Sequence, residues 1–102
     1  MLYKVLILFI FSLTGMSMTV VDVRTEAEWD TGHLEGALHI EWQDILNISS
    51  DIQKDEEIFL YCRSGNRSGK ATKILVDAGY INAKNAGSIE DASELLDIKI
   101  ID

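Results

Sequence analysis

Residues 58–68 read Ile-Phe-Leu-Tyr-Cys-Arg-Ser-Gly-Asn-Arg-Ser, an apolar run that passes directly into a polar loop. The apolar run is typical of a buried strand, and apolar residues between positions 71 and 78 then recur at helical spacing. Cys62, the only cysteine of the chain, therefore lies where a strand ends and a helix is about to begin. At such a junction the first backbone N–H groups lack a helical partner, so they can converge on an anion.

Cys62 in this position is a candidate nucleophile. The N–H dipoles, together with the guanidinium groups of Arg63 and Arg67, would stabilise a thiolate and lower the pKa of the thiol. Gly65 allows the backbone to turn tightly around the sulfur. The alternative is a buried structural cysteine, but a polar loop with two arginines favours a reactive role.

Short apolar runs and helical patterns alternate along the rest of the chain. We expect strands at residues 19–24, 36–40, 58–61 and 83–86, and helices at 25–32, 41–47, 67–78 and 88–96. This alternation predicts an α/β domain with a mainly parallel central sheet flanked by helices. In such a sheet the functional crevice lies at the carboxyl ends of the strands, where Cys62 is placed.

Local signals define several of these helices. The capping-box patterns Thr25–Glu28 and Ser88–Asp91 open two of them, and Gly79 ends the helix that follows the cysteine loop. In the helix at 41–47 we expect three apolar side chains to point inward, namely Trp42, Ile45 and Leu46.

The first 17 residues have the outline of a secretory signal peptide. Lys4 precedes an apolar core at residues 5–13, and Gly15 and Ser17 supply the small residues of a cleavage site. The core is shorter than the roughly 20 residues that span a membrane, and no cysteine follows it as a lipid anchor would require. We therefore expect one mature domain at 18–102, located in the periplasm without a stable membrane anchor.

The net charge of −8 gives no electrostatic basis for binding nucleic acid. The densest basic group, Arg63, Arg67, Lys70 and Lys73, instead lies in and after the cysteine loop, which favours a small anionic substrate. A single cysteine in an exported chain cannot form an internal disulfide, which again favours a reactive thiol. No metal site of recognised spacing is present, so we expect neither a metal nor a cofactor.

Several pieces of this sequence, in order, cover nearly the whole predicted mature domain and resemble the rhodanese family. They are Val21-Asp22-Val23-Arg24, residues 32–40, residues 61–68, Ala78-Gly79-Tyr80 and Asn85-Ala86-Gly87. The chain is most similar to the small single-domain exported rhodaneses of the phage shock protein E type. The resemblance implies a rhodanese fold and a sulfurtransferase that moves sulfane sulfur through a cysteine persulfide. Thiosulfate is the usual donor in tests of that family, and cyanide or a thiol is the acceptor.

The resemblance also implies roles for individual residues. Cys62 matches the nucleophile that forms the persulfide, and Arg67 matches the arginine that closes its loop. The loop whose backbone N–H groups surround the sulfur, and which binds the substrate, corresponds to Arg63, Ser64, Gly65, Asn66 and Arg67. Asp22 and Arg24 match a pair that mainly supports the fold near the site.

Three further positions bear on this resemblance. His33 aligns with a recurrent histidine, for which we expect a structural role. Glu35 stands where the family often has proline, which should alter only a surface turn. Ser88 stands where a second glycine is common, at the lip of the pocket.

In the mechanism that the resemblance implies, Arg63 and Arg67 guide thiosulfate and the Cys62 thiolate attacks its outer sulfur. A cysteine phosphatase is a poorer match, because its loop places five residues between Cys and Arg, whereas four separate Cys62 from Arg67. A persulfide carrier, or a non-enzymatic interaction module for a specific exported partner, remains an open alternative.

Overall fold

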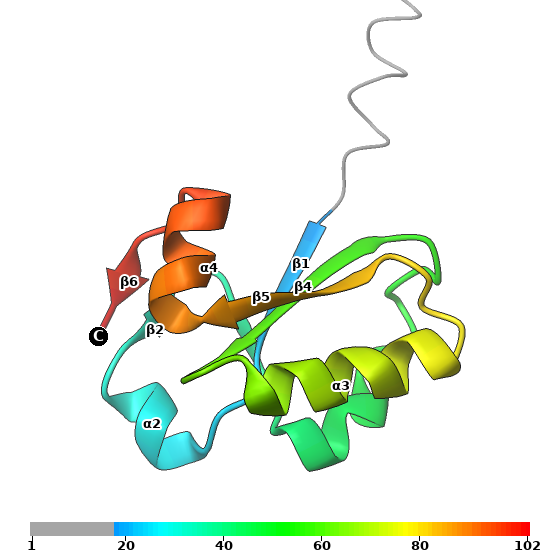
Figure 1. The fold of residues 1–102 in the computed structure, drawn as a ribbon, viewed down its shortest axis with the longest axis horizontal. Coiled ribbons are helices and arrows are strands. Elements are labelled where there is room, and N and C mark those ends of the chain that lie inside the picture. Colours follow the sequence, from blue (N-terminus) through cyan, green and yellow to red (C-terminus); the bar gives the residue numbers. More distant parts are fainter. Residues whose placement is uncertain (1–17) are drawn as a thin grey trace, which may run out of the picture.

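A parallel sheet forms the centre of the fold (Figure 1). The computed structural model describes residues 18–102, so the predicted signal peptide at 1–17 lies outside the described residues. Within that range four parallel strands pair in the order β3-β1-β4-β5. Their bounds are β1 (Met18–Asp22), β3 (Leu38–His39), β4 (Glu57–Cys62) and β5 (Ala83–Ser88). The predicted α/β class with a mainly parallel sheet is confirmed.

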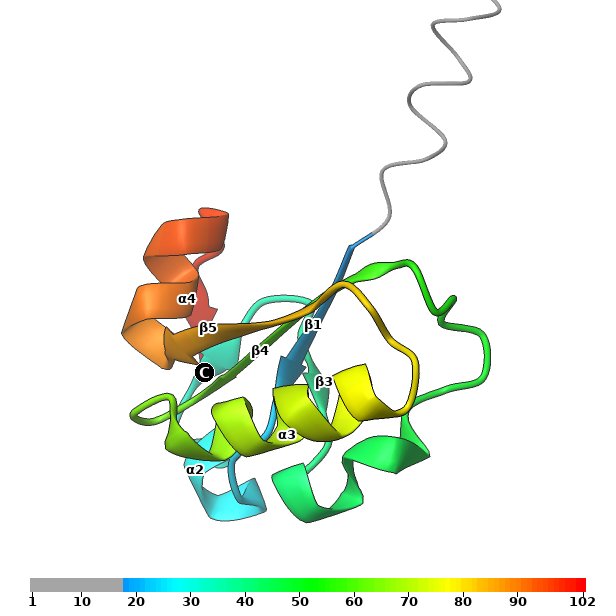
Figure 2. The ribbon, with the colours of Figure 1, turned by 45° about the vertical axis from the view of Figure 1, so that its right-hand side comes forward.

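Both faces of the sheet are covered, which explains why β4 is almost continuously apolar. Ile58 and Leu60 point to one face, where they pack with Leu75 of α3 (Asn66–Asp77). Tyr61 points to the other face and packs with Ile89 of α4 (Ile89–Leu96). Figure 2 shows α3 and α4 on their separate sides of the strands.

Two glycines in the left-handed region flank helix α3. Gly65 precedes its first residue with φ +95°, and Gly79 follows its end with φ +102°. The Gly79 N–H donates to the Val76 carbonyl and the Tyr80 N–H donates to the Leu75 carbonyl, so these carbonyls of the last helical turn have hydrogen-bond partners. The expected helix at 67–78 and its predicted end at Gly79 are therefore confirmed.

Two capping boxes fix the starts of the other α-helices. Thr25 caps α2 (Glu26–Asp30) through a reciprocal bond with Glu28, and Ser88 caps α4 in the same way with Asp91. Both match the sequence prediction. Ser88, where the family often has a glycine, thus serves as a helix cap.

The segment expected as a helix at 41–47 is instead the 3₁₀ helix η1 (Trp42–Asn47). Ile45 is fully buried and Trp42 packs against the core, as predicted. Leu46 is 60% exposed, so its predicted inward orientation is wrong. Asp44 inside η1 has non-helical dihedral angles (φ −104°, ψ 15°), so two short 3₁₀ turns meet there at a kink and helical spacing does not carry Leu46 to the buried face.

The sequence did not predict the small antiparallel pair formed by β2 (His33–Leu34) and β6 (Ile100–Ile101). The Glu35 N–H extends this pair by donating to the Lys99 carbonyl at 3.0 Å. Proline, which the family often has at this position, has no N–H and could not form this bond. The expectation that Glu35 alters only a surface turn is therefore wrong.

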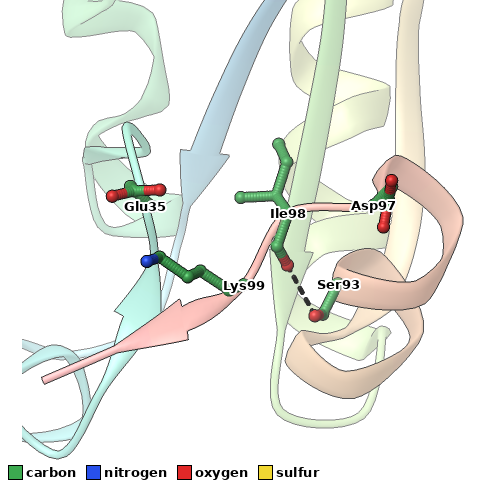
Figure 3. Close-up of a pocket in the computed structure, with 5 residues that line it drawn as sticks. All are labelled: Glu35, Ser93, Asp97, Ile98 and Lys99. Atoms are coloured by element: carbon green, nitrogen blue, oxygen red, sulfur yellow. Dashed lines mark hydrogen bonds between the residues drawn. The ribbon is translucent and has the colours of Figure 1, made fainter.

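The chain reaches β6 from α4 through a short connection (Figure 3). Asp97 adopts the left-handed conformation there, with φ 54°, and the Ser93 hydroxyl donates to the Ile98 carbonyl at 2.6 Å. A pocket of about 480 Å³ lies beside this connection, lined by Glu35, Ser93, Asp97, Ile98 and Lys99. These residues hold the C-terminal segment and take no part in the cysteine loop.

Among residues 18–102, no helix is both long enough and apolar enough to cross a membrane.

Candidate active site

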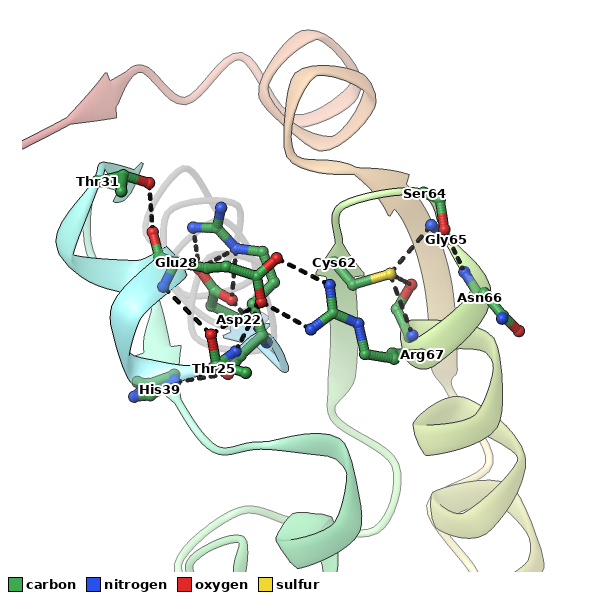
Figure 4. Close-up of polar contacts among 12 residues, drawn as sticks. Asp22, Thr25, Glu28, Thr31, His39, Cys62, Ser64, Gly65, Asn66 and Arg67 are labelled. Carbon is green, nitrogen blue, oxygen red and sulfur yellow. Dashed lines mark hydrogen bonds and ion pairs between the residues drawn. The ribbon is translucent and has the colours of Figure 1, made fainter.

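Cys62 is the last residue of β4 and is fully buried. Its Sγ accepts hydrogen bonds from the Gly65 N–H at 3.0 Å and from the Ser68 N–H at 3.5 Å (Figure 4). The Ser68 hydroxyl lies 3.3 Å from the same sulfur. The structure thus places hydrogen-bond donors around the sulfur at the carboxyl end of the strand.

These contacts follow from the local backbone. Gly65 turns the chain with φ +95° immediately before α3, so the unpartnered N–H groups of the first helical turn face back toward Cys62. A Cβ at position 65 would lie 3.4 Å from the Gly87 Cα, and a side chain there would also strain the backbone.

Opposing effects set the pKa of the Cys62 thiol. Burial raises it, but hydrogen bonds from the Ser68 hydroxyl and from the N–H groups of Ser68, Ser64 and Gly65 outweigh burial. The net result is a pKa of about 7, below the ordinary value of 9.0. About half of the protein would therefore carry a thiolate at pH 7.

Asn85 of β5 holds this arrangement from the neighbouring strand. Its Nδ2 donates to the Gly65 carbonyl at 3.0 Å, and its Oδ1 accepts from the Gly87 N–H at 3.0 Å. The Ser68 hydroxyl donates to the same Oδ1 at 2.7 Å, so its one proton is shared between Asn85 and the sulfur. Asn85 therefore connects both the loop and the hydroxyl beside the sulfur to the sheet.

Sequence reasoning did not identify Ser68 or Asn85 as site residues. Ser68 could have been found, because it stands in the first turn of a helix whose N-terminus faces the cysteine. The role of Asn85 depends on β5 lying beside β4, which no local pattern reveals.

Arg67 makes a bidentate ion pair with Glu28 of α2. Its Nη1 lies 2.7 Å from Oε1 and its Nη2 lies 3.0 Å from Oε2. The pair raises the pKa of Arg67, and mainly through this contact the pKa of Glu28 falls to about 2. The guanidinium that we expected to contact the sulfur donor is thus engaged by a carboxylate that sequence reasoning did not single out.

The other predicted loop residues are exposed. The Ser64 hydroxyl accepts from the Asn66 N–H at 3.4 Å, and neither of these side chains contacts the sulfur. In the described part of the chain Arg63 makes no ion pair. It lines an open pocket of about 620 Å³ beside Glu28 and Glu90.

The lysines of the predicted basic group lie apart from the sulfur contacts. Lys73 pairs with Asp77 at 3.1 Å, and the Lys70 ammonium lies 5.1 Å from the centre of the Trp42 ring. Of the two loop arginines, Arg63 is therefore the one that makes no ion pair within residues 18–102.

Asp22 and Arg24 form a buried ion pair behind the site, with 2.8 Å between Nη2 and Oδ2. The same Nη2 donates to the Gly32 carbonyl at 2.7 Å, and the guanidinium lies 5.7 Å from the centre of the Tyr61 ring. Burial lowers the pKa of Arg24, but the contact with Asp22 outweighs it and the pKa is raised. The pair joins the end of β1 to the start of β2, so its geometry is that of a fold-supporting contact.

His33 and His39 both stack on Trp29, with ring centres at 3.5 Å and 5.1 Å. The Nδ1 of His33 donates to the Trp29 carbonyl at 3.2 Å, and the Nε2 of His39 donates to the Arg24 carbonyl at 2.8 Å. His33 is a packing residue in this structure. Within residues 18–102 no group of His, Cys, Asp and Glu side chains could hold a metal ion.

A family profile, a curated relative and a solved structure all relate this chain to rhodanese proteins. The sequence profile of the family described as a rhodanese-like domain matches residues 13–94. Thiosulfate sulfurtransferase PspE of Escherichia coli (strain K12) is 32% identical over 73 residues, which cover 70% of this chain and 70% of that protein. The solved structure described as a rhodanese with anions from E. coli superposes with a TM-score of 0.69 at 30% identity, over 74% of this chain and 91% of the other. The chain belongs to the rhodanese family, which includes the sulfurtransferase PspE.

One other relative is much longer. The adenylyltransferase and sulfurtransferase UBA4 of Lodderomyces elongisporus is 31% identical over 90 residues, and this chain spans only 20% of it. The match of the family profile begins at residue 13, inside the predicted signal peptide, and the domain boundary at 18 stays a prediction.

Proposed function

We propose that the protein is a sulfurtransferase that moves sulfane sulfur from thiosulfate, or a similar small anionic donor, to a thiophilic acceptor such as cyanide or a thiol. The sulfur would travel as a persulfide on Cys62. One observation carries the proposal: a buried sulfur that accepts hydrogen bonds from Gly65 and Ser68 and has a pKa of about 7. Such a thiol is a nucleophile at neutral pH without a general base.

In the first half-reaction the Cys62 thiolate attacks the outer sulfur of thiosulfate. A bond forms between Sγ and that sulfur, and the bond to the sulfonate sulfur breaks with its electron pair leaving on sulfite. The product is a persulfide anion, which the loop N–H groups would stabilise as they do the thiolate. The acceptor then removes the outer sulfur in a second step, so ping-pong kinetics are expected.

The shape of the loop supports sulfur over phosphate. Four residues separate Cys62 from Arg67, one fewer than in the phosphatase loop, and the Arg67 guanidinium is directed to Glu28. A phosphatase would need that guanidinium for its tetrahedral substrate.

A second candidate is a persulfide carrier that delivers sulfur to one exported partner. The Arg67–Glu28 ion pair favours it, because it leaves a single free guanidinium, that of Arg63, to attract a small dianion to the loop. The range of acceptors distinguishes the two candidates: a free-standing enzyme discharges to many small acceptors, whereas a carrier discharges to its partner alone.

The test is the intact mass of the purified protein after treatment with thiosulfate, beside Cys62→Ala. We expect the wild type alone to gain one sulfur atom and to lose it as thiocyanate when cyanide is added. A folded, reduced wild type that gains no sulfur would refute the proposal.

We also propose that residues 1–17 are a signal peptide and that the domain acts in the periplasm. After expression of the full chain in a Gram-negative host, the periplasmic fraction should contain a product that starts within two residues of Met18. Recovery of only the uncleaved chain in the cytoplasm would contradict this.

A further inference from the structure

The pocket beside the cysteine loop, called the mouth pocket below, carries charges of both signs. It lies between helix α2, the first residue of the loop and the first turn of α4, and its volume is about 620 Å³. This volume falls in the range of about 300 to 1,000 Å³ that is usual for small-molecule sites. Arg63, which borders it, directly follows the nucleophile Cys62.

Two of the charged groups that line the mouth pocket are already paired. Arg24 is engaged by Asp22, and Glu28 is engaged by Arg67. The remaining two, Arg63 and Glu90, have opposite signs, and neither makes an ion pair in the part of the chain that the structure describes.

This combination suits some ligands better than others. A dianion such as thiosulfate would gain from Arg63 but would meet the carboxylate of Glu90 in the same pocket, together with that of the paired Glu28. A ligand with one carboxylate and one ammonium group would match both free charges. A carboxylate can bind the Arg63 guanidinium through two parallel hydrogen bonds, while an ammonium is a compact donor for the Glu90 carboxylate.

We infer that the mouth pocket binds the sulfur acceptor and that this acceptor is a small thiol with both a carboxylate and an ammonium group, the class of amino-acid thiols. The inference rests on the proposed function, because it assumes a persulfide on Cys62. Arg63 binds the carboxylate of the acceptor and Glu90 binds its ammonium group. Both contacts hold the thiol beside the loop that carries the outer sulfur.

The transfer step balances without any further reagent. The acceptor thiol loses its proton to solvent, and its thiolate attacks the outer sulfur of the Cys62 persulfide. A new bond forms between the acceptor sulfur and the outer sulfur of the persulfide, and the bond between that outer sulfur and Sγ breaks. Its electron pair returns to Sγ, which regenerates the Cys62 thiolate and releases the acceptor as its persulfide.

The test uses the sulfur-loaded protein and four thiols that differ in charge. These are cysteine, cysteamine with the ammonium alone, 3-mercaptopropionate with the carboxylate alone, and neutral 2-mercaptoethanol. The rate constant for loss of the sulfur atom is measured by intact mass and corrected for the thiolate fraction of each thiol and for the dependence of thiolate nucleophilicity on the thiol pKa. Because exposed ion pairs contribute about 0.2 to 1 kcal/mol each and cysteine would form two of them, we expect cysteine to react about 2- to 30-fold faster than 2-mercaptoethanol.

Variants assign the two contacts. Arg63→Gln should abolish the advantage that the carboxylate confers, and Glu90→Gln should abolish the advantage of the ammonium group. Glu94→Gln is the matched control, since it removes the same charge from the same helix at a position that does not line the mouth pocket. Each variant is compared with its own rate for 2-mercaptoethanol, which cancels general effects on the persulfide.

Equal corrected rates for the four thiols, or a cysteine advantage that survives both substitutions, would overturn the inference while the observed discharge still demonstrated sulfur transfer. Failure of the wild type to load sulfur, or to discharge it even to cyanide, would overturn the proposed function and this inference together.

Discussion

Replacing Ser68 with alanine tests whether hydrogen bonds, rather than free charges, activate the cysteine. The substitution removes the hydroxyl that lies 3.3 Å from Sγ but keeps the Ser68 N–H that also donates to the sulfur. Asn85 keeps a partner for its Oδ1 in the Gly87 N–H, so the loop should hold its shape. The expected result is a higher pKa for the Cys62 thiol.

The size of the shift follows from the geometry. Hydrogen bonds to a charged group contribute about 1.5 to 3 kcal/mol. The Ser68 hydroxyl has a single proton, and the Asn85 Oδ1 at 2.7 Å competes with the sulfur for it, so the bond to the sulfur should be near the low end of that range. One pKa unit corresponds to about 1.4 kcal/mol, so we expect the pKa of Cys62 to rise from about 7 to about 8 in the variant.

Alkylation by iodoacetamide across pH measures this shift. At pH 7 the thiolate fraction falls from about one half to about one tenth. A more basic thiolate is, however, about threefold more nucleophilic per pKa unit. The variant should therefore react about twofold more slowly at pH 7 and about threefold faster at pH 9.5, and the two profiles should cross at about pH 7.5.

Ser64→Ala is the control, because the Ser64 hydroxyl is exposed and accepts from the Asn66 N–H without touching the sulfur. Its profile should match that of the wild type. Superimposable profiles for wild type and Ser68→Ala would refute the argument that this hydroxyl stabilises the thiolate.

Other contacts give predictions of their own. The pKa of Glu28 is lowered from 4.5 to about 2, so its stabilising effect is complete above pH 4.5 and is lost as pH falls toward 2. Urea unfolding should therefore show a larger loss of stability between pH 5 and pH 3 in the wild type than in Glu28→Gln, and equal losses would contradict this. Tyr61→Phe should lower the free energy of unfolding by about 1 to 3 kcal/mol in urea titrations, because the buried Leu34 N–H then loses its acceptor, the Tyr61 hydroxyl at 3.0 Å. Glu35→Pro removes the N–H that donates to the Lys99 carbonyl, so the free energy of opening β6 should fall by about 1 kcal/mol. Amide hydrogen exchange in β6 should then accelerate, and unchanged exchange would show that this bond does not hold the strand.

The sheet and the helix that carry the cysteine could be predicted because their signals are local. The apolar run before Cys62, the glycines at 65 and 79 and the two capping boxes each specify a strand or a helix end through contacts within a few residues. For the same reason the predicted position of Cys62 at the carboxyl end of a strand is confirmed.

What could not be predicted depends on contacts between distant residues or on a small difference in helix type. The β2–β6 pair joins residues at opposite ends of the domain, His33 with Ile101 and Leu34 with Ile100, so no local pattern indicates it. The predicted inward position of Leu46 is wrong because regular helical periodicity does not hold across the kink at Asp44 in this 3₁₀ segment. Glu28 and Asn85 reach the cysteine loop from α2 and β5, and their partners are fixed only once these elements pack.

The pairing of Glu28 with Arg67 changes the account of how the thiol is activated. Two arginines beside a cysteine suggest that positive charge lowers its pKa, but the Arg67 guanidinium is held by a carboxylate and Arg63 is exposed to solvent. The groups in contact with the sulfur are instead neutral dipoles, the N–H groups of Gly65 and Ser68 and the Ser68 hydroxyl. Dipoles at contact distance are not screened by salt as exposed charges are, so the thiolate is stabilised without a strong field at the mouth of the site. Activation of the thiol therefore does not depend on Arg63 and Glu90, the two mouth-pocket charges that we propose bind the acceptor.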